Sequence, residues 1–193
     1  LAIQGEGHTF AKLVDVNHIR RSYSFLLATA HEVLNENLLA VTASSPLHPE
    51  WETREAIDFA TVLGVEHMIV QSKEMHRADF LSNTKERCYL CKKYLIEELL
   101  KISSHRNIQH VAHGANIDDL SDYRPGFAAA QEMGIKAPLV DANLTKNDIR
   151  LLSKQMNLPT WNKPSKVSSS PTKKGTGSKK NRLWRKMITR NDQ

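Results

Sequence analysis

The sequence predicts an α/β domain with a mostly parallel sheet and helices on both faces. Short, continuous apolar runs alternate along the chain with longer segments whose apolar residues recur at helical spacing. Turn residues such as Gly and Pro separate the two kinds of segment. The 193 residues, of which 40% are hydrophobic, suffice for one sizeable domain.

The first half of the chain gives two helices and two strands. Apolar residues after Tyr23 lie on one helical stripe, and this helix should end near residues 35–37. Residues 38–43 are all apolar or Thr, which is typical of a strand covered on both faces. A second helix should begin after Pro49 and end at Gly64, followed by a second buried strand at residues 65–70.

The second half continues the alternation after a polar connection. We expect a helix at residues 88–102, a strand at 108–112, a helix at 125–133, a short strand at 138–140 and a helix at 145–156. Thr145 and Asp148 form a capping-box pattern at the start of the last helix. In parallel sheets of this kind ligands bind at the carboxyl ends of the strands, where loops 43–49, 71–87 and 113–126 would converge.

The two ends of the chain differ from this body. Residues 1–20 are poorly patterned, and we expect them to supply no first strand, which would expose a sheet edge. The predicted domain therefore spans residues 21–164. The net charge is +6, but ten of the 27 basic residues and one of the 21 acids lie from Lys163 onward. We expect residues 165–193 to be a disordered basic tail, and nucleic-acid binding through it is the less favoured alternative to simple solvation.

Composition also bears on location and on the cysteines. No apolar run approaches the roughly 18–20 residues of a membrane span and no signal-peptide pattern opens the chain, so we expect a cytoplasmic protein. Cys88 and Cys91 are the two cysteines, in the order RCYLCK at residues 87–92. The pair could be half of a metal site or a redox pair, but a surface turn of a helix is favoured because further ligands are not at suitable spacing.

The stretch HGANIDDLSDYRPG, residues 113–126, carries the clearest candidate chemistry. It joins a predicted strand to a predicted helix and contains adjacent carboxylates, an Asn and an Arg. These groups suit a cation together with a phosphorylated ligand. An acidic turn that caps a helix is the alternative interpretation.

Six segments in order resemble the ATP-dependent sacrificial sulfur transferases of the LarE type. These are N-type ATP pyrophosphatases, or PP-loop proteins, of the adenine nucleotide alpha hydrolase-like (HUP, Rossmann-like) superfamily. The resemblance covers roughly residues 24–164. The segments are AVTASSPLHPE (40–50), RCYLCK (87–92), HGANIDD (113–119), DYRPG (122–126), LTK with IR (144–150) and LPTWNKP (158–164).

The resemblance implies an enzyme that binds ATP and Mg²⁺. Such an enzyme adenylates a carboxylate of a pyridinium dicarboxylate mononucleotide, releases pyrophosphate and then donates sulfur from a cysteine, in nickel-pincer cofactor biosynthesis. Its partner would be a small, nucleotide-like substrate, and homo-oligomers are expected from the family.

The resemblance also assigns roles to residues. Thr42, Ala43 and Ser45 would lie on the adenosine, and Asp118 and Asp119 would hold magnesium. Arg87 and Lys92 would touch the phosphate or carboxylate of the substrate. The remaining expected ATP and phosphate ligands are Gly114, Asn116, Arg124, Lys146 and Arg150.

Two departures from the family pattern put activity in doubt. The pyrophosphate loop Ser-Gly-Gly-Val-Asp-Ser is expected just before Phe25, but HIRRSYS stands at residues 18–24. Its bulky side chains would fill the phosphate space. The sulfur-bearing cysteine of the family is expected near Val167, but Val-Ser-Ser-Ser stands at residues 167–170, so no catalytic residue is assigned. A one-base slip in suitable codons reproduces both stretches, and we hypothesise shifted reading frames, which resequencing the gene would test.

Three functions therefore remain open. The leading one is a sulfur transferase by descent, inactive as written. The second is another PP-loop ATP pyrophosphatase, such as an NAD or GMP synthetase or a tRNA thiolase. The third is a non-catalytic, degenerate nucleotide-binding fold.

Overall fold

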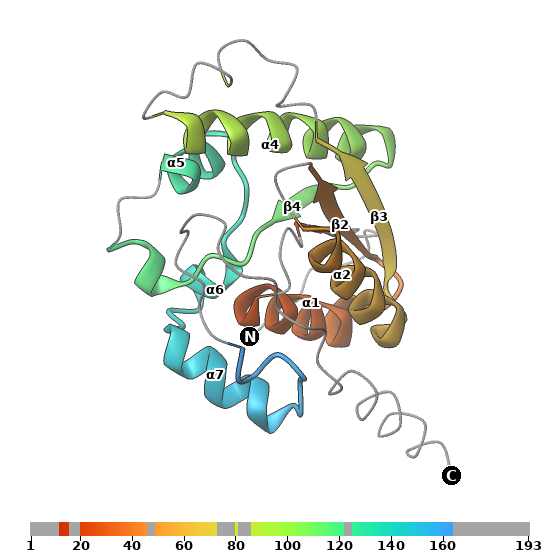
Figure 1. The fold of residues 1–193 in the computed structure, drawn as a ribbon, viewed down its shortest axis with the longest axis vertical. Helices are drawn as coiled ribbons and strands as arrows, with labels where there is room; N and C mark the ends of the chain where they lie inside the picture. The colour runs from red at the N-terminus through yellow and green to blue at the C-terminus, as the bar shows by residue number, and fades with distance from the viewer. Residues whose placement is uncertain are drawn as a thin grey trace.

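The computed structural model describes residues 12–15, 20–45, 49–72, 80, 86–121 and 125–163. They form a four-stranded sheet between two layers of helices (Figure 1). The predicted α/β class, with a parallel sheet and helices on both faces, is confirmed. The predicted tail and most of the poorly patterned first segment lie outside the described residues. No helix in the described part of the chain is long and apolar enough to cross a membrane.

The strands lie in the order β3-β2-β1-β4, and every pair is parallel. Their bounds are Lys12–Asp15 for β1, Leu38–Ser44 for β2, Glu66–Gln71 for β3 and His110–Ala112 for β4. Strand β1 pairs with β2 on one side and with β4 on the other, so the strand order reverses direction at β1. Open parallel sheets bind ligands at the carboxyl edge beside such a reversal.

The position of β1 corrects the expectation that residues 1–20 supply no strand. Lys12–Asp15 takes a central place, with Val14 paired to Ala40 of β2 and to Ala112 of β4. A four-residue strand can form here because both neighbours satisfy its backbone groups. So short a run is not visible as a pattern in the sequence, since its stability comes from pairing with distant strands.

Strand β2 is buried on both faces, as predicted. Leu38 and Ala40 join one apolar cluster, whereas Leu39, Val41 and Ala43 join the other. Strand β3, predicted to be buried, is instead the edge strand: none of its six residues is fully buried, and Ile69 is 42% exposed. A strand with one neighbour keeps part of its surface in solvent whatever its apolar content.

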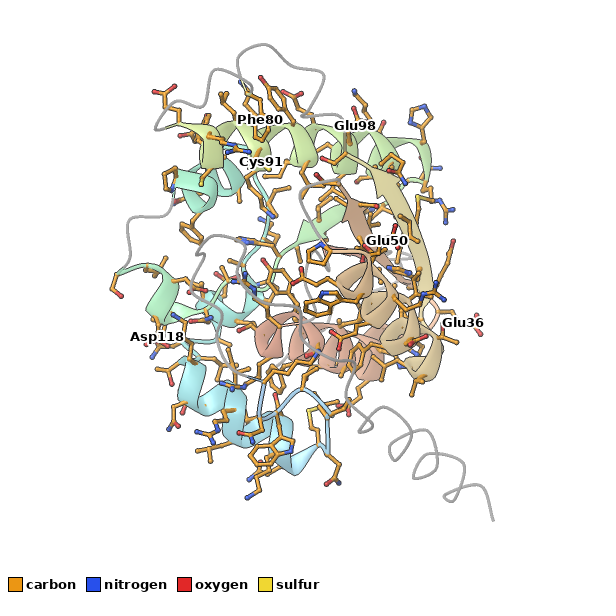
Figure 2. All side chains as sticks on the ribbon, viewed as in Figure 1. Glu36, Glu50, Phe80, Cys91, Glu98 and Asp118 are labelled. Carbon is orange, nitrogen blue, oxygen red and sulfur yellow. The ribbon has the colours of Figure 1, made fainter. Side chains whose placement is uncertain are left out.

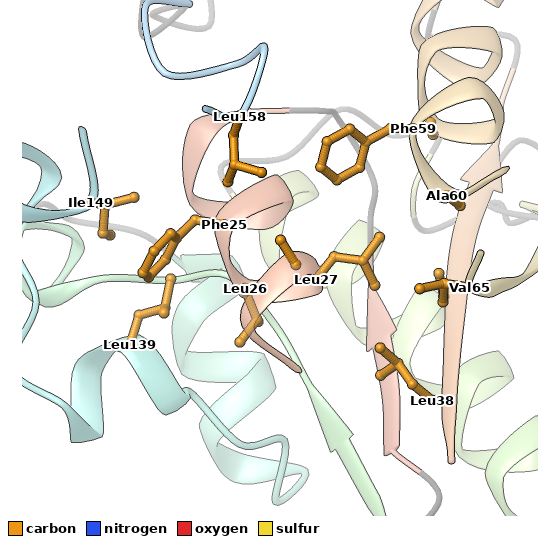
Figure 3. Packing of buried hydrophobic residues seen from close by; sticks show 13 residues of the cluster. Phe25, Leu26, Leu27, Leu38, Phe59, Ala60, Val65, Leu139, Ile149 and Leu158 are labelled. Carbon is orange, nitrogen blue, oxygen red and sulfur yellow. The ribbon is translucent and has the colours of Figure 1, made fainter. Parts of the chain in front are cut away.

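Helices α1 (Arg21–Leu34) and α2 (Glu50–Leu63) lie on one side of the sheet, and α4 (Arg87–His105) and α5 (Pro125–Glu132) on the other (Figure 1). Helix α2 ends at Gly64 with φ 70°, as predicted. Helix α7 (Lys146–Gln155) packs against α1, and Ile149 and Leu158 close the core over Phe25 (Figure 3). The Thr145–Asp148 capping box at the start of α7 is confirmed.

The predicted short strand at residues 138–140 is wrong. Pro138–Asp141 is a single helical turn, α6, with Pro138 at its start. Among the described residues, the parallel pairing on this side of β4 is a single bridge between Ala112 and Lys136. Proline favours the first turn of a helix because its fixed φ suits it and its missing N–H is not needed there.

Candidate functional site

The candidate site lies at the carboxyl edge of the sheet, where β4 ends and α1 begins. The turn η2 (Ile117–Asp119) follows β4 and contacts two other elements. Asn116 Nδ2 donates to Ser22 Oγ of α1 at 3.3 Å, and Ile117 N donates to Leu144 O, just before α7, at 3.0 Å. The structure thus brings the predicted segments 113–119 and 144–150 together against α1.

The two adjacent carboxylates of η2 both stabilise backbone turns. Asp119 is 7% exposed and its Oδ2 accepts hydrogen bonds from Asn116 N (3.1 Å) and Nδ2 (2.8 Å). Its Oδ1 lies 3.1 Å from Lys146 Nζ. Asp118 Oδ2 accepts from the backbone N of Lys146 at 2.5 Å, at the start of α7. The capping role that the sequence left open is therefore present in the structure.

These carboxylates fit a magnesium ion only as part of a larger ligand set. No group of three or more His, Cys, Asp or Glu side chains suited to a metal gathers among the described residues. Magnesium commonly takes one or two carboxylates and completes its shell with substrate phosphates and water. Asp118 and Asp119 suit that arrangement, in which a bound nucleotide would bring the ion with it.

The start of α1 holds bulky side chains where the resemblance predicts a glycine-rich loop. Arg20, the N-cap residue, forms no side-chain cap, and Arg21 Nη2 donates to Lys163 O at 2.6 Å. Tyr23 packs on Gly114: a Cβ added to Gly114 would lie 3.0 Å from two ring atoms of Tyr23. The start of α1 is therefore tightly packed, and the expectation that these side chains occupy the phosphate space stays a prediction.

Ser24 is the loop-end residue that matches the family pattern, and it is completely buried. Its Oγ lies 2.5 Å from Thr160 Oγ1, in the segment that follows α7. The sequence indicated both segments through the family motifs, but it gave no signal for this contact. Ser24 thus ties α1 to the segment carrying Trp161.

The expected adenosine residues lie at the end of β2. Thr42, Ala43 and Ser45 are 3%, 7% and 6% exposed, and Thr42 Oγ1 lies 2.9 Å from His67 Nε2 on β3. A cavity of about 500 Å³ opens beside them, between the ends of β2 and β3 and the start of α2. The described residues that line it are Ser44, Ser45, Glu50, Thr53, Arg54, Ile57 and Gln71. The end of β2 therefore offers space next to a buried polar wall.

Acidification is expected to destabilise the fold through His67. Burial lowers the pKa of His67 below its ordinary value of 6.5. The unfolded chain then binds more protons between the folded pKa and about pH 6.5, so this stability is present above pH 6.5 and is lost as the pH falls through the folded pKa. The free energy of unfolding, measured in urea at about pH 7.5 and 5.5, should change less with pH in His67→Gln than in the unmodified chain. The exposed His105→Gln control should retain the dependence of the unmodified chain, and equal slopes for all three would contradict the assignment.

Two predicted positions lie outside the described residues. One is Arg124, an expected phosphate ligand. The other is Val167, near which the sulfur-bearing cysteine of the family is expected and where the sequence has Val-Ser-Ser-Ser instead. The catalytic residue therefore stays unassigned.

The RCYLCK segment lies away from η2. Arg87 stacks on Phe80, with its guanidinium carbon 4.8 Å from the ring centroid, and Lys92 lies against Gly126 of α5. Cys88 is exposed and Cys91 is half-buried, and no disulfide joins them. Figure 2 shows Cys91 and Phe80 well apart from Asp118, so the structure does not gather this segment around the acidic turn.

Arg150 lies near the candidate site, on α7. Its Nη2 donates to Asn162 Oδ1 at 3.3 Å, and its guanidinium carbon is 5.9 Å from the Trp161 ring centroid. The side chain is exposed. Arg150 could therefore turn toward a phosphate, whereas Lys146 is held by Asp119.

Comparison with known sequences identifies relatives, although no protein-family model matches the chain. A Synechocystis protein named uncharacterized protein slr1717 is 40% identical over 136 residues, which is 70% of this chain and 50% of that protein. The pyridinium-3,5-bisthiocarboxylic acid mononucleotide synthase of Lactiplantibacillus plantarum is 29% identical over 167 residues, 83% of this chain and 60% of that protein. The chain thus spans only half to three-fifths of the length of these relatives.

Solved structures share the fold. The U34-tRNA thiolase NcsA of Methanococcus maripaludis, solved with its [4Fe-4S] cluster, has a TM-score of 0.63 and 17% identity, covering 85% of this chain and 63% of that one. NMN synthetase from Francisella tularensis has a TM-score of 0.62 and 15% identity, covering 80% and 66%. At these identities the likeness establishes the fold and leaves the reaction open.

Proposed function

We propose that this chain, which belongs to the LarE-type PP-loop family, carries the nucleotide-binding domain of an ATP-dependent sulfur transferase. The reaction would adenylate a carboxylate of a pyridinium dicarboxylate mononucleotide and release pyrophosphate, in nickel-pincer cofactor biosynthesis. A cysteine thiolate would then displace AMP to form a thioester, and elimination across the cysteine Cβ–Sγ bond would leave a thiocarboxylate on the substrate and dehydroalanine in the protein. The relationship to the Lactiplantibacillus enzyme supports this acceptor. Location in the cytoplasm and assembly into homo-oligomers remain predictions.

The observation that carries the proposal is the meeting of three segments beside the sheet reversal at β1. The start of α1, the η2 turn and the start of α7 are joined there by hydrogen bonds. In the proposed complex Asp118 and Asp119 hold magnesium, which neutralises phosphate charge. Thr42, Ala43 and Ser45 bind the adenosine. The phosphate ligands are Gly114, Asn116, Arg124, Lys146 and Arg150.

The chain as written should be a poor catalyst. Arg21 and Tyr23 replace the second glycine and the aspartate of the family loop, and the Tyr23 ring packs against Gly114. A backbone cradle for phosphates needs the close approach that glycine allows. These contacts favour, as the second candidate, a degenerate fold that no longer turns over ATP.

Acceptor-dependent pyrophosphate release tests the function. The variant to use is the loop-restored chain, which combines Ile19→Ser, Arg20→Gly, Arg21→Gly, Ser22→Val and Tyr23→Asp. We expect ATP-dependent pyrophosphate release with a pyridinium-3,5-dicarboxylate mononucleotide. Release only with ammonia and nicotinic acid mononucleotide, or only with tRNA, would instead support another PP-loop enzyme class.

A further inference from the structure

Two arginine side chains from different helices meet at the turn of residues 160–163. Arg21, the first residue of α1, donates from Nη2 to the carbonyl oxygen of Lys163 at 2.6 Å. Arg150, on α7, donates from Nη2 to Asn162 Oδ1 at 3.3 Å. Because their acceptors belong to adjacent residues, the two guanidinium groups share one small region of the surface.

The carboxylates around this region are engaged elsewhere. Glu55 pairs with Lys163 Nζ at 2.7 Å, Asp119 pairs with Lys146, and Asp118 accepts the backbone N–H of Lys146. Among the described residues no carboxylate forms an ion pair with Arg21 or Arg150. Arg21 Nε is buried and has no hydrogen-bond partner in that part of the chain.

The adjoining end of α1 adds further positive potential. This 14-residue helix has no acidic residue in its first turn and no side-chain cap. The partial positive charge of a helix start favours anions. Burial lowers the pKa of Arg21, and the nearby positive charge of Arg150 lowers it further. The arrangement is thus a concentration of positive charge that a bound anion would relieve.

We propose that Arg21 and Arg150, beside the positive end of α1, bind a small oxyanion of the phosphate type. Guanidinium groups present pairs of N–H donors that match the oxygens of a phosphate. The site requires no ATP turnover and depends on Arg21, which stands where the family loop has glycine. It is therefore a property of the chain as written and should be lost in the loop-restored chain.

Calorimetric titration of the full chain with inorganic phosphate, at constant ionic strength in chloride, tests the proposal. We expect saturable binding that Arg150→Gln and Arg21→Gln each weaken about tenfold, because each removes a charge-assisted contact. Lys154→Gln is the matched control: it removes one positive charge from α7, and Lys154 Nζ lies 5.3 Å from the centroid of the same Trp161 ring. This control should change the affinity less than about threefold, since long-range charge alone is screened by salt.

Several results would overturn the proposal. One is that the unmodified chain shows no saturable phosphate binding. Another is that Lys154→Gln weakens phosphate binding as much as Arg150→Gln does. Because Arg150 is exposed, Arg150→Gln decides the outcome even if Arg21→Gln fails to fold.

Parallel titration with AMP separates free phosphate from the phosphate group of a nucleotide. Similar affinities support recognition of the phosphate alone, and tighter AMP binding that Arg150→Gln also weakens supports a nucleotide phosphate. Binding of AMP without any binding of phosphate would contradict the site. None of these results depends on pyrophosphate release, so the sulfur-transferase proposal can fail separately.

Discussion

The loop-restored chain is expected to bind ATP and magnesium about a hundredfold more tightly than the chain as written. Glycines at positions 20 and 21 would let backbone N–H groups at the start of α1 approach the phosphates. Two added hydrogen bonds to a charged group, at about 1.5 kcal/mol each, give about 3 kcal/mol, which is about a hundredfold in affinity. Equilibrium titration with ATP in the presence of magnesium measures the change.

A matched control separates backbone approach from the removal of bulk and charge. It carries Ile19→Ser, Ser22→Val and Tyr23→Asp, with Arg20→Ala and Arg21→Ala in place of the glycine substitutions. We expect it to bind ATP little better than the unmodified chain, since each alanine Cβ obstructs the approach. Equal affinity of the alanine and glycine versions would show that close backbone approach is not what the chain lacks.

The loop-restored chain should bind inorganic phosphate more weakly than the unmodified chain does. Removing Arg21 eliminates one of the two guanidinium groups of the proposed oxyanion site, whereas the new glycines favour a nucleotide with several phosphates. Opposite changes in phosphate and ATP affinity would therefore distinguish the present site from a restored family site. A loss of both phosphate affinity and ATP affinity would indicate a folding defect, which circular dichroism of the variant can detect.

The fold was predictable where local signals and tertiary packing agree. Pro49 and Gly64 bracket α2 because their backbone preferences suit a helix start and a left-handed stop. Thr145 and Asp148 cap α7 through contacts three residues apart, so the sequence contains the whole motif. Strand β2 was visible because burial on both faces requires an unbroken apolar run.

The errors concern short segments and positions in the sheet. Strand β1 has four residues and depends on neighbours that lie far along the chain. The three apolar residues before Asp141 fit a strand or a helical turn equally well, and the helix is set by Pro138. The apolar content of β3 did not reveal that it is an edge strand, because edge position depends on topology and not on composition.

The candidate site was predictable in its segments and not in its contacts. The HGANIDD and LTK segments could be selected from residue types and family order. The bonds from Asn116 to Ser22 and from Arg21 to Lys163 join residues far apart in the chain. No local pattern reports such pairs. The oxyanion site was missed for this reason, since its two arginines meet only through the turn at residues 160–163.

The close contact between Gly114 and α1 gives the largest expected loss of stability. A Cβ at Gly114 would lie 3.0 Å from the ring atoms Cγ and Cδ1 of Tyr23 and 3.1 Å from its Cα. Gly114 is not among the glycines with positive φ, so alanine fits its backbone conformation and the cost is steric. We expect Gly114→Ala to lower the free energy of unfolding by about 1–3 kcal/mol, as overpacking does in tight interiors, measured by urea unfolding.

Two comparisons show whether Tyr23 causes this loss. In Gly126→Ala the nearest atom to the new Cβ is 3.3 Å away, so a smaller loss is expected there. Tyr23→Ala removes the ring and should recover a large part of the Gly114→Ala cost, leaving the contribution of the nearby Tyr23 Cα. A double-mutant cycle with no coupling between positions 23 and 114 would contradict the packing described here. Strong coupling would establish that the Tyr23 ring packs directly on Gly114 after the end of β4, so that the tyrosine at the start of α1 sets the steric limit at position 114.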